Sequence, residues 1–374
     1  MGMRYSDYVD YEKLDLVKRM ALEKFMPTTS HPERFRIKYR IESVGETSSV
    51  YEFLDYDFMI AFIIESLGTK ILDPDRIRGK MEISQEFLGK QIYKGIGQDA
   101  IAMPVYDLNA VGALPIGLGD ILASGVSDYF EKDMDRTEQL LDGFKIGADL
   151  AKASLACGDT PTLKDLVNPE SLVIMAAGFG IVKPKERFTE GGRKIQAGDI
   201  LIGFESNGIH SNGLTLARAI VEKSPEGYTT KLPNGEMIGE ALLKPTKIYT
   251  GLIEDLFKAG VEIHYIIPVT GHSYQKIARS KLKPFTYKIE FLPEPQPEFA
   301  WLQEIGPVTK KEAYRTWNMG IGMVIVVPSE YEEAIAPISR KHGIEYHVLG
   351  KVEEGPRQVV MPFKENGKPV LYIP

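Results

Sequence analysis

A charged, glycine-containing segment at residues 183–198 divides the chain into two halves, each with the elements of a folded domain. On both sides of it, segments rich in β-branched and aromatic residues alternate with amphipathic segments. The 374 residues also exceed the size at which one hydrophobic core usually stops growing, so the sequence predicts two α+β domains. We place a leader of one helix and a loop at residues 1–45, an N-terminal α/β domain at 46–182 and a C-terminal α/β domain at 183–374.

The spacing of apolar residues predicts the individual elements. In the first half we expect helices at residues 11–25, 94–111 and 133–155, two strands joined by a tight turn within 48–64, and strands at 115–123 and 172–182. In the second half we expect strands at 200–204, 262–268, 285–292 and 322–327, a C-terminal strand pair, and helices at 213–222, 246–259, 273–279, 297–304, 310–316 and 331–342.

Charge and cysteine content exclude several classes of function. A formal net charge of −7 argues against a general nucleic-acid binder, which needs a basic surface to displace counterions from phosphates. The longest apolar stretches, residues 59–64 and 323–327, are too short to span a bilayer, and the N-terminus is too charged for a signal peptide. The single cysteine, Cys157, cannot form an internal disulfide and fits a reducing compartment. We therefore expect a cytoplasmic protein with no membrane partner.

Residues 198–213 combine an apolar strand with a polar glycine loop. They read Gly-Asp-Ile-Leu-Ile-Gly-Phe-Glu-Ser-Asn-Gly-Ile-His-Ser-Asn-Gly. A loop that opens a helix offers backbone N–H groups to an anion. The side chains around it that are able to bind a ligand are Ser206, Asn207, His210, Ser211 and Asn212. Of these, His210 is the group expected to exchange a proton near neutral pH. On physical grounds alone, the loop is either a ligand site or an ordinary strand–turn–helix connection.

This loop resembles the signature of the aminoimidazole ribonucleotide synthetase family, the phosphoribosylformylglycinamidine cyclo-ligases of purine biosynthesis. Members of that family read roughly Gly-Asp-(Val/Ile)-Leu-Ile-Gly-Leu-x-Ser-Ser-Gly-(Leu/Ile)-His-Ser-Asn-Gly. The similarity continues in order through Gly112-Ala-Leu-Pro115, Gly158-Asp-Thr160, Val269-Thr-Gly271 and residues 317–327. It covers most of the chain beyond the first forty-odd residues.

A second similar motif lies at residues 64–70, which read Ile-Glu-Ser-Leu-Gly-Thr-Lys where the family has Thr-Asp-Gly-Val-Gly-Thr-Lys. The resemblance assigns Glu65, Gly68, Thr69 and Lys70 to ATP. A carboxylate suits Mg²⁺, and a hydroxyl and an ammonium suit phosphate oxygens. Without its neighbours, the same motif is more simply a turn at a strand end.

Two further acids complete the metal site that the resemblance implies. Asp107 matches the acid of the family's Asn-Asp-Ile segment, and Asp159, followed by Thr160, matches the first glutamate of Gly-Gly-Glu-Thr-Ala-Glu. With Glu65 they are predicted to bind Mg²⁺, because carboxylates placed together repel unless a cation lies among them. The resemblance also assigns Asp107, Asp159 and Thr160 to the ATP site. The alternative is that each acid merely solvates a turn or caps a helix.

The chain also departs from the family at several positions. Residues 44–50 contain one glycine where the family has a glycine-rich loop, and residues 159–163 lack the family's second glutamate. His272 and Ser273 replace glycines, and Glu65 is one methylene longer than the usual aspartate. These changes put the substrate in question more than the fold. With a Lys- and Glu-rich surface, they predict a divergent archaeal or thermophilic member.

The resemblance implies a two-domain fold whose N-terminal, ATP-binding sheet forms a barrel with the same sheet of a second subunit, and hence a homodimer. It implies that ATP and Mg²⁺ serve the closure of formylglycinamidine ribonucleotide to aminoimidazole ribonucleotide. The implied catalytic residues are His210, Lys70 and Asp107, and the implied contacts to the phosphorylated substrate are Ser206, Asn207, His210, Ser211 and Asn212. Two alternatives remain: an ATP-dependent enzyme of the same superfamily acting on another small phosphorylated or acyl substrate, and a non-catalytic nucleotide-binding protein.

Overall fold

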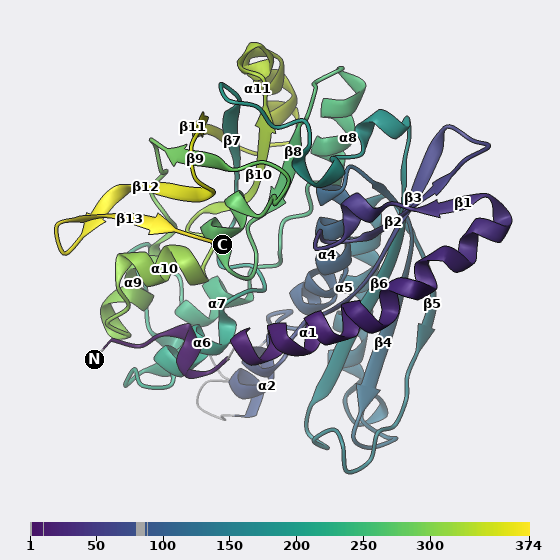
Figure 1. Ribbon diagram of the computed structural model, residues 1–374. Helices are drawn as coiled ribbons and strands as arrows, with labels where there is room; N and C mark the ends of the chain where they lie inside the picture. Colours follow the sequence, from purple (N-terminus) through teal and green to yellow (C-terminus); the bar gives the residue numbers. More distant parts are fainter. Residues whose placement is uncertain (1, 10, 80–86, 88) are drawn as a thin grey trace.

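The computed structural model describes residues 2–9, 11–79, 87 and 89–374, which form two sheet-containing domains lying side by side (Figure 1). The N-terminal elements are α1 (Tyr11–Phe25), β1 (Ile37–Tyr39), β2 (Ser49–Phe53), β3 (Phe58–Ser66), α2 (Leu72–Gly79), α4 (Lys94–Ala110), β4 (Leu114–Ser124), α5 (Met134–Ala151), β5 (Ser154–Asp159) and β6 (Leu172–Val182). The C-terminal strands are β7 (Ile200–Glu205), β8 (Tyr265–Pro268), β9 (Phe285–Ile289), β10 (Ile321–Val327), β11 (Tyr346–Glu354), β12 (Gln358–Glu365) and β13 (Lys368–Tyr372). The C-terminal helices are α6 (Leu214–Val221), α7 (Ile238–Leu243), α8 (Thr250–Lys258), the 3-10 helix η8 (Ser273–Ala278), α9 (Pro297–Ile305), α10 (Lys310–Thr316) and α11 (Glu332–Lys341).

The N-terminal sheet has one covered face and one open face. Its strand order is β1-β2-β3-β6-β4-β5, in which β4 and β5 run parallel and the other neighbours antiparallel. Along β6 alternate residues such as Leu172, Ile174 and Ala176 are buried on the side of α4 and α5. The opposite face carries apolar side chains that are 37–57% exposed, namely Phe62, Ile64, Ile121 and Phe179. An apolar face of this kind is typical of a surface that binds another protein.

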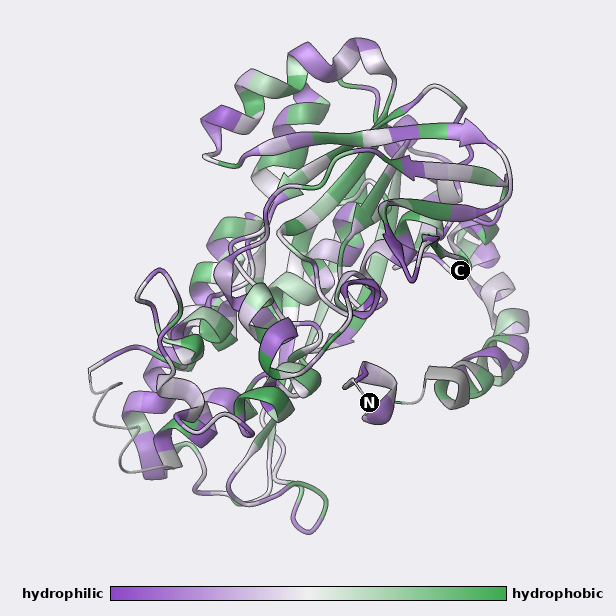
Figure 2. Cartoon of the chain, turned by 90° about the vertical axis from the view of Figure 1, so that its left-hand side faces the viewer, coloured by the Kyte–Doolittle hydropathy of each residue, from purple (hydrophilic) through white to green (hydrophobic). Residues whose placement is uncertain are grey.

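The C-terminal sheet is buried more completely. Its order is β13-β12-β9-β11-β7-β10-β8, and every residue of β10 is buried. Val324 and Val326 enter one hydrophobic core, whereas Met323 and Ile325 enter another on the other side of the strand. A continuous run of β-branched residues is typical of a strand covered on both faces. Figure 2 shows the hydrophobic strands inside and hydrophilic residues on the outer helices. Within the described part of the chain, no helix has both the length and the apolar character needed to cross a bilayer.

Most predicted elements are confirmed, with corrections at five places. The helix predicted at residues 133–155 was wrong at its end: α5 stops at Ala151, where Lys152 takes a left-handed φ of 55°, and β5 follows. The C-terminal strand pair is three strands, β11, β12 and β13. Residues 273–279 form a 3-10 rather than an α-helix, and α7 was not predicted. Strand β1, within the predicted leader, pairs with β2 at the edge of the sheet.

Helices and buried ion pairs join the two domains, and Arg218 with Asp73 is an example. Helices α4 and α5 lie between the two sheets and contact α8 (Figure 1). The Nη2 atom of Arg218 in α6 lies 2.9 Å from Oδ2 of Asp73 in α2. The Tyr228 hydroxyl donates to Oδ1 of the same carboxylate at 2.8 Å. Burial raises the pKa of Asp73, while Arg218 and Tyr228 act in the opposite direction. The carboxylate therefore depends on these partners to remain charged.

We expect Arg218→Met to lower the free energy of unfolding by about 3–5 kcal/mol, because it leaves a buried carboxylate without its partner. Urea unfolding followed by circular dichroism measures the difference. The control is Arg36→Met, whose pair with Asp55 is exposed and should contribute less than about 1 kcal/mol. Equal losses in the two variants would contradict the assignment of the Arg218 pair as a joint between the domains.

Candidate active site

The polar loop after β7 has a strained and closely packed backbone. It begins after Glu205 and ends where α6 starts at Leu214, and His210 within it has a φ of 61°. Gly213 has a φ of 80°, and a Cβ atom there would lie 2.4 Å from Cδ1 of Trp317. Only glycine fits such a position without a shift of the indole ring.

Side chains from the segment before β10 hold the start of this loop. The Ser206 hydroxyl donates to Oδ1 of Asn318 at 3.0 Å, and Asn318 Nδ2 donates to the carbonyl of Gly208 at 2.8 Å. Gln296 Nε2 donates to the carbonyl of Ser206 at 2.8 Å. Ser206 is itself buried, so its hydroxyl serves the loop rather than an open surface.

The next part of the loop binds the segment that joins α7 to α8. Asn207 Nδ2 donates to the carbonyl of Pro245 at 2.9 Å, and Asn207 Oδ1 lies 2.9 Å from Nε2 of His210. The hydroxyls of Ser211 and Thr246 are also 2.9 Å apart. Asn212 is half-buried next to them. Three of the predicted substrate residues therefore bind other parts of the chain, which fixes the loop against its support.

Lys70 lies beneath the loop in a fully buried ion pair. Its Nζ atom is 2.7 Å from Oδ2 of Asp99 in α4 and donates to the carbonyl of Lys244 at 3.0 Å. The other oxygen of Asp99, Oδ1, accepts hydrogen bonds from the backbone N–H and the hydroxyl of Thr246, both at 2.6 Å. The structure thus places the Lys70 ammonium inside the protein, in a network that reaches the loop through Thr246.

His210 is almost completely enclosed, with 3% of its surface exposed. Burial lowers the pKa of His210 well below 6.5, and the positive charges of Lys70 and Lys247 lower it further. This differs from the expectation that the imidazole exchanges a proton near pH 7, because the charged form would be unsolvated and close to two cations. Its Nδ1 atom is buried and has no hydrogen-bond partner among the described residues.

Glu65 and Asp107 lie next to each other in the structure. Glu65 lies near the end of β3, Asp107 lies in the last turn of α4, and the two carboxyl groups are close enough for the charge of Glu65 to act on Asp107. Burial, with Glu65 as a contributing neighbour, raises the pKa of Asp107 to about 8, although Lys276 and Arg279 act in the opposite direction. Burial likewise lowers the pKa of Lys276, whose Nζ atom donates to the hydroxyl of Thr270 at 2.6 Å. The N-terminal domain thus supplies two acids here and the C-terminal domain two cations.

The turn between Glu65 and Lys70 remains open to solvent on one side. Gly68 has a φ of 72°, and nothing lies within 4 Å of the place where a Cβ atom would stand. The exposed Thr69 has its hydroxyl 3.2 Å from that of Thr215 in α6. This turn therefore presents backbone and hydroxyl groups to solvent at the boundary between the domains.

Asp159 and Thr160 lie elsewhere in the described structure. Both are exposed at the end of β5, which is separated from β3 by two intervening strands, β6 and β4. Adjacent strands are about 4.8 Å apart, so β5 lies about 14 Å from β3. Among the residues that the structure describes, no three His, Cys, Asp or Glu side chains gather as a metal site. Within the chain, Glu65 and Asp107 therefore lie together and Asp159 lies apart from them.

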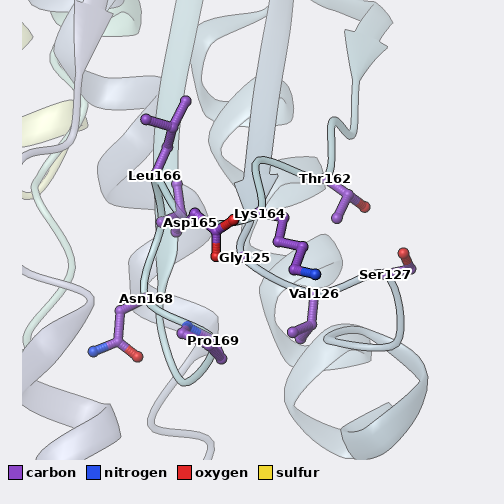
Figure 3. A pocket seen from close by; sticks show the side chains of 10 residues that line it. Gly125, Val126, Ser127, Thr162, Lys164, Asp165, Leu166, Asn168 and Pro169 are labelled. Carbon is purple, nitrogen blue, oxygen red and sulfur yellow. The ribbon is translucent and has the colours of Figure 1, made fainter.

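The segment that follows Thr160 lines a surface pocket. Its cavity has a volume of about 540 Å³ and lies between residues 125–127 and residues 162–169. In Figure 3 the Lys164 side chain extends towards Val126 and Ser127. Asp165 in this segment has a left-handed φ of 65°. This pocket lies at the β5 edge of the sheet, beyond Asp159, and does not include the Glu65–Asp107 pair.

The turn that departs from the family keeps an unusual backbone. His272 and Ser273 have φ values of 66° and 44°, in the region that glycine adopts most easily. Ser273 is buried and donates through its hydroxyl to the carbonyl of Trp317. This turn therefore combines larger side chains with the left-handed backbone that glycine adopts most easily.

Sequence reasoning missed Asp99, Lys276 and Arg279. Asp99 could have been recognised from the sequence, because it lies between Ile96 and Ala100 on the apolar side of a predicted helix. A charged side chain at such a position requires a buried partner. The two cations could not be recognised in this way, because Lys and Arg in a short helix are usually solvated.

These features define a two-domain α+β protein in which polar and charged residues of both domains gather at the boundary between the domains. The model of the AIR synthase related protein N-terminal domain matches residues 54–182, and the C-terminal domain model matches residues 196–362. A phosphoribosylformylglycinamidine cyclo-ligase from Methanocaldococcus jannaschii is 35% identical over 284 residues, which cover 75% of this chain and 77% of that protein. The protein of the same name from Methanosarcina acetivorans is 32% identical over 333 residues, 88% of this chain and 91% of that one. The chain therefore belongs to the AIR synthase family, and the resemblance noted in the sequence is confirmed, with archaeal relatives.

A solved structure supports the fold independently. AaThiL, in complex with AMPPCP and TMP, superimposes with a TM-score of 0.60 over 99% of both chains at 16% sequence identity. At this identity the likeness shows the fold alone. It confirms the predicted two-domain α+β architecture.

We expect His210 to make stability depend on pH. Its pKa is lowered in the folded protein, so the unfolded chain binds the extra proton first as the pH falls below about 6.5. The stabilisation is fully present above that pH, and below it the free energy of unfolding should fall by up to about 1.4 kcal/mol per pH unit. Urea unfolding of the wild type and His210→Gln between pH 7.5 and 5 measures this contribution as the difference in slope.

The matched control is His31→Gln, because His31 is exposed in the 3-10 segment after α1. It should leave the pH dependence of the wild type unchanged. The same slope in the wild type and in His210→Gln would contradict a buried, neutral His210.

Proposed function

We propose that the chain catalyses the ATP-dependent closure of formylglycinamidine ribonucleotide to aminoimidazole ribonucleotide, a step of purine biosynthesis. The observation that carries this proposal is the 35% identity, over three quarters of the chain, to a relative named phosphoribosylformylglycinamidine cyclo-ligase. The site supports it, because an acid pair, two cations and a polar glycine loop suit a nucleotide and a phosphorylated substrate. Cys157 is free and exposed, which suits the cytoplasm as the compartment.

Glu65 and Asp107 fit a Mg²⁺ ion. They are hard oxygen donors already in contact, and their mutual repulsion would be relieved by a cation. Mg²⁺ is commonly held by one or two carboxylates together with substrate phosphates, and when bound it neutralises charge on the transferred phosphoryl group. We propose that Gly68 and Thr69 contact the phosphates. The participation of Asp159 and Thr160 stays a prediction, and their position on β5 favours a nucleotide contact over a shared ion.

The reaction requires the formyl oxygen to become a leaving group. That oxygen attacks the γ-phosphorus of ATP, and the bond from phosphorus to ADP breaks. The amidine nitrogen then adds to the formyl carbon and loses a proton, and the carbon–oxygen bond breaks as inorganic phosphate leaves. Lys276 and Arg279 place positive charge beside the acid pair, where it offsets the charge of the phosphoryl group.

We propose that the loop at residues 206–212 binds the ribose phosphate of the substrate through its backbone N–H groups and Asn212. Ser206, Asn207 and Ser211 would position this backbone, since their side chains already bind the protein. His210 would contribute through Nδ1 in its neutral form. Lys70 would act indirectly, by fixing Thr246 below the loop through Asp99.

Asp107→Asn should abolish Mg²⁺-dependent ATP binding and lower turnover by at least about a hundredfold, because an amide cannot balance the charge of the cation. The fold should persist, since the amide has the shape of the protonated acid. Titration calorimetry with ATP and Mg²⁺, and the colour reaction of the aminoimidazole product, measure the two effects. The matched control, Asp57→Asn in the exposed β2–β3 turn, should change neither. Unchanged ATP affinity in Asp107→Asn would remove this residue from the metal site, and no product from the wild-type protein would refute the proposed reaction.

We also propose a homodimer through the open face of the N-terminal sheet. Ile64→Lys should then yield a monomer, because Ile64 is 57% exposed on that face and a charge there would be buried in the dimer. Light scattering should give twice the chain mass of 41.8 kDa for the wild type and the single mass for the variant. Leu371→Lys, in the edge strand β13 of the other domain, is the control and should remain dimeric. A monomeric wild type at micromolar concentration would contradict the dimer.

A further inference from the structure

A bend before β2 connects the two domains beside the acid pair. Residues 44–48 form this bend, and Gly45 allows it with a φ of 82°. The side chain of Glu46 is 6% exposed and points its carboxylate at the C-terminal domain. The Tyr265 hydroxyl lies 2.9 and 2.8 Å from the two oxygens of that carboxylate, and Arg279 Nη2 lies 2.9 Å from Oε2.

These three side chains form a closed set of interactions. Arg279 Nε also donates to the Tyr265 hydroxyl oxygen at 2.8 Å, so the phenol accepts from Arg279 and donates to Glu46. Burial raises the pKa of Tyr265, which keeps its hydroxyl proton in place as the donor. Glu46 belongs to the N-terminal domain. Tyr265 lies in β8, and Arg279 is the residue that follows η8, both in the C-terminal domain. The bend is therefore tied to two separate elements of the other domain.

The same bend touches the element that carries Asp107. The Thr47 hydroxyl, next to Glu46 in sequence, donates to the backbone carbonyl of Asp107 at 2.7 Å. The positive charge of Arg279 also acts on the Asp107 carboxyl group. The third nitrogen of the guanidinium, Nη1, is buried and has no hydrogen-bond partner among the described residues. The bend thus contacts the backbone of Asp107 through Thr47, and Glu46 holds a cation whose Nη1 atom has no hydrogen-bond partner among the described residues.

We infer that Glu46 is a positioning residue that keeps this bend and the Arg279 guanidinium fixed around the Glu65–Asp107 pair before any nucleotide binds. The bend and the Arg279 guanidinium are then already ordered in the nucleotide-free protein. ATP binding therefore does not have to order them. The statement about ATP rests on the proposed function, whereas the fixed bend does not.

The test compares wild type, Glu46→Gln and a matched control, Glu52→Gln. Glu52 is in β2 and pairs with Arg40 and Lys185, away from Tyr265 and Arg279. In the nucleotide-free protein, amide hydrogen exchange at residues 44–50 should be about tenfold faster in Glu46→Gln, and unchanged in the control. The KM for ATP should rise by about tenfold with kcat changed by less than about twofold.

A second variant covers the case in which Glu46→Gln fails to fold. Tyr265→Phe removes only the hydroxyl, keeps the ring, and should also speed exchange at residues 44–50. Exchange equal to the wild type in both variants would overturn the fixed bend. Faster exchange with an unchanged KM for ATP would overturn its link to the nucleotide site. If the wild type bound no ATP, the proposed function would fail, and the exchange comparison would still decide the role of Glu46.

Discussion

The buried ion pair between Lys70 and Asp99 is the constraint on which the site depends. Both side chains are fully buried, so each would be strongly destabilising without the other. The pair is tolerated because Asp99 also accepts two hydrogen bonds from Thr246, and Lys70 donates to the carbonyl of Lys244. These bonds cross the domain boundary and end directly beneath the polar loop. The turn at residues 64–70 and the loop at residues 206–212 are therefore parts of one rigid unit, although they belong to different domains.

The charges around the acid pair are divided between the domains. Glu46, Glu65 and Asp107 come from the N-terminal half, and Lys276 and Arg279 come from the C-terminal half. Opposite charges across a boundary favour one relative placement of the domains, because displacement would leave buried charges without partners. The metal–nucleotide complex of the proposed function carries both signs and would suit such a divided site, with its cation beside the acids and its phosphates beside Lys276 and Arg279.

The sequence predicted the fold better than it predicted the site. Apolar periodicity identified β10 and α4 within a residue or two, because a strand or helix buries its own pattern of side chains. The end of α5 was missed, since a Lys in the left-handed conformation at position 152 has no marker such as glycine. The motif at residues 64–70 identified Lys70, but not its burial, because its partner Asp99 is 29 positions away and Thr246 lies in the other domain. Pairing of this kind depends on tertiary packing, which one sequence does not reveal.

The loop that best identifies the family uses most of its polar side chains for internal support. Ser206, Asn207 and Ser211 bind Asn318, Pro245 and Thr246, so these side chains define the shape of the loop and contribute little to the choice of ligand. Groups that would remain for a ligand are the loop's backbone N–H groups, Asn212, Nδ1 of His210 and the exposed turn at Gly68 and Thr69. Backbone groups recognise an anion such as a phosphate without regard to the rest of the molecule. Under the proposed function, the loop would therefore provide affinity for a phosphate group. Selection among phosphorylated ligands would then depend on other segments, and the turn at His272 and Ser273 is one candidate, because it carries side chains on a left-handed backbone.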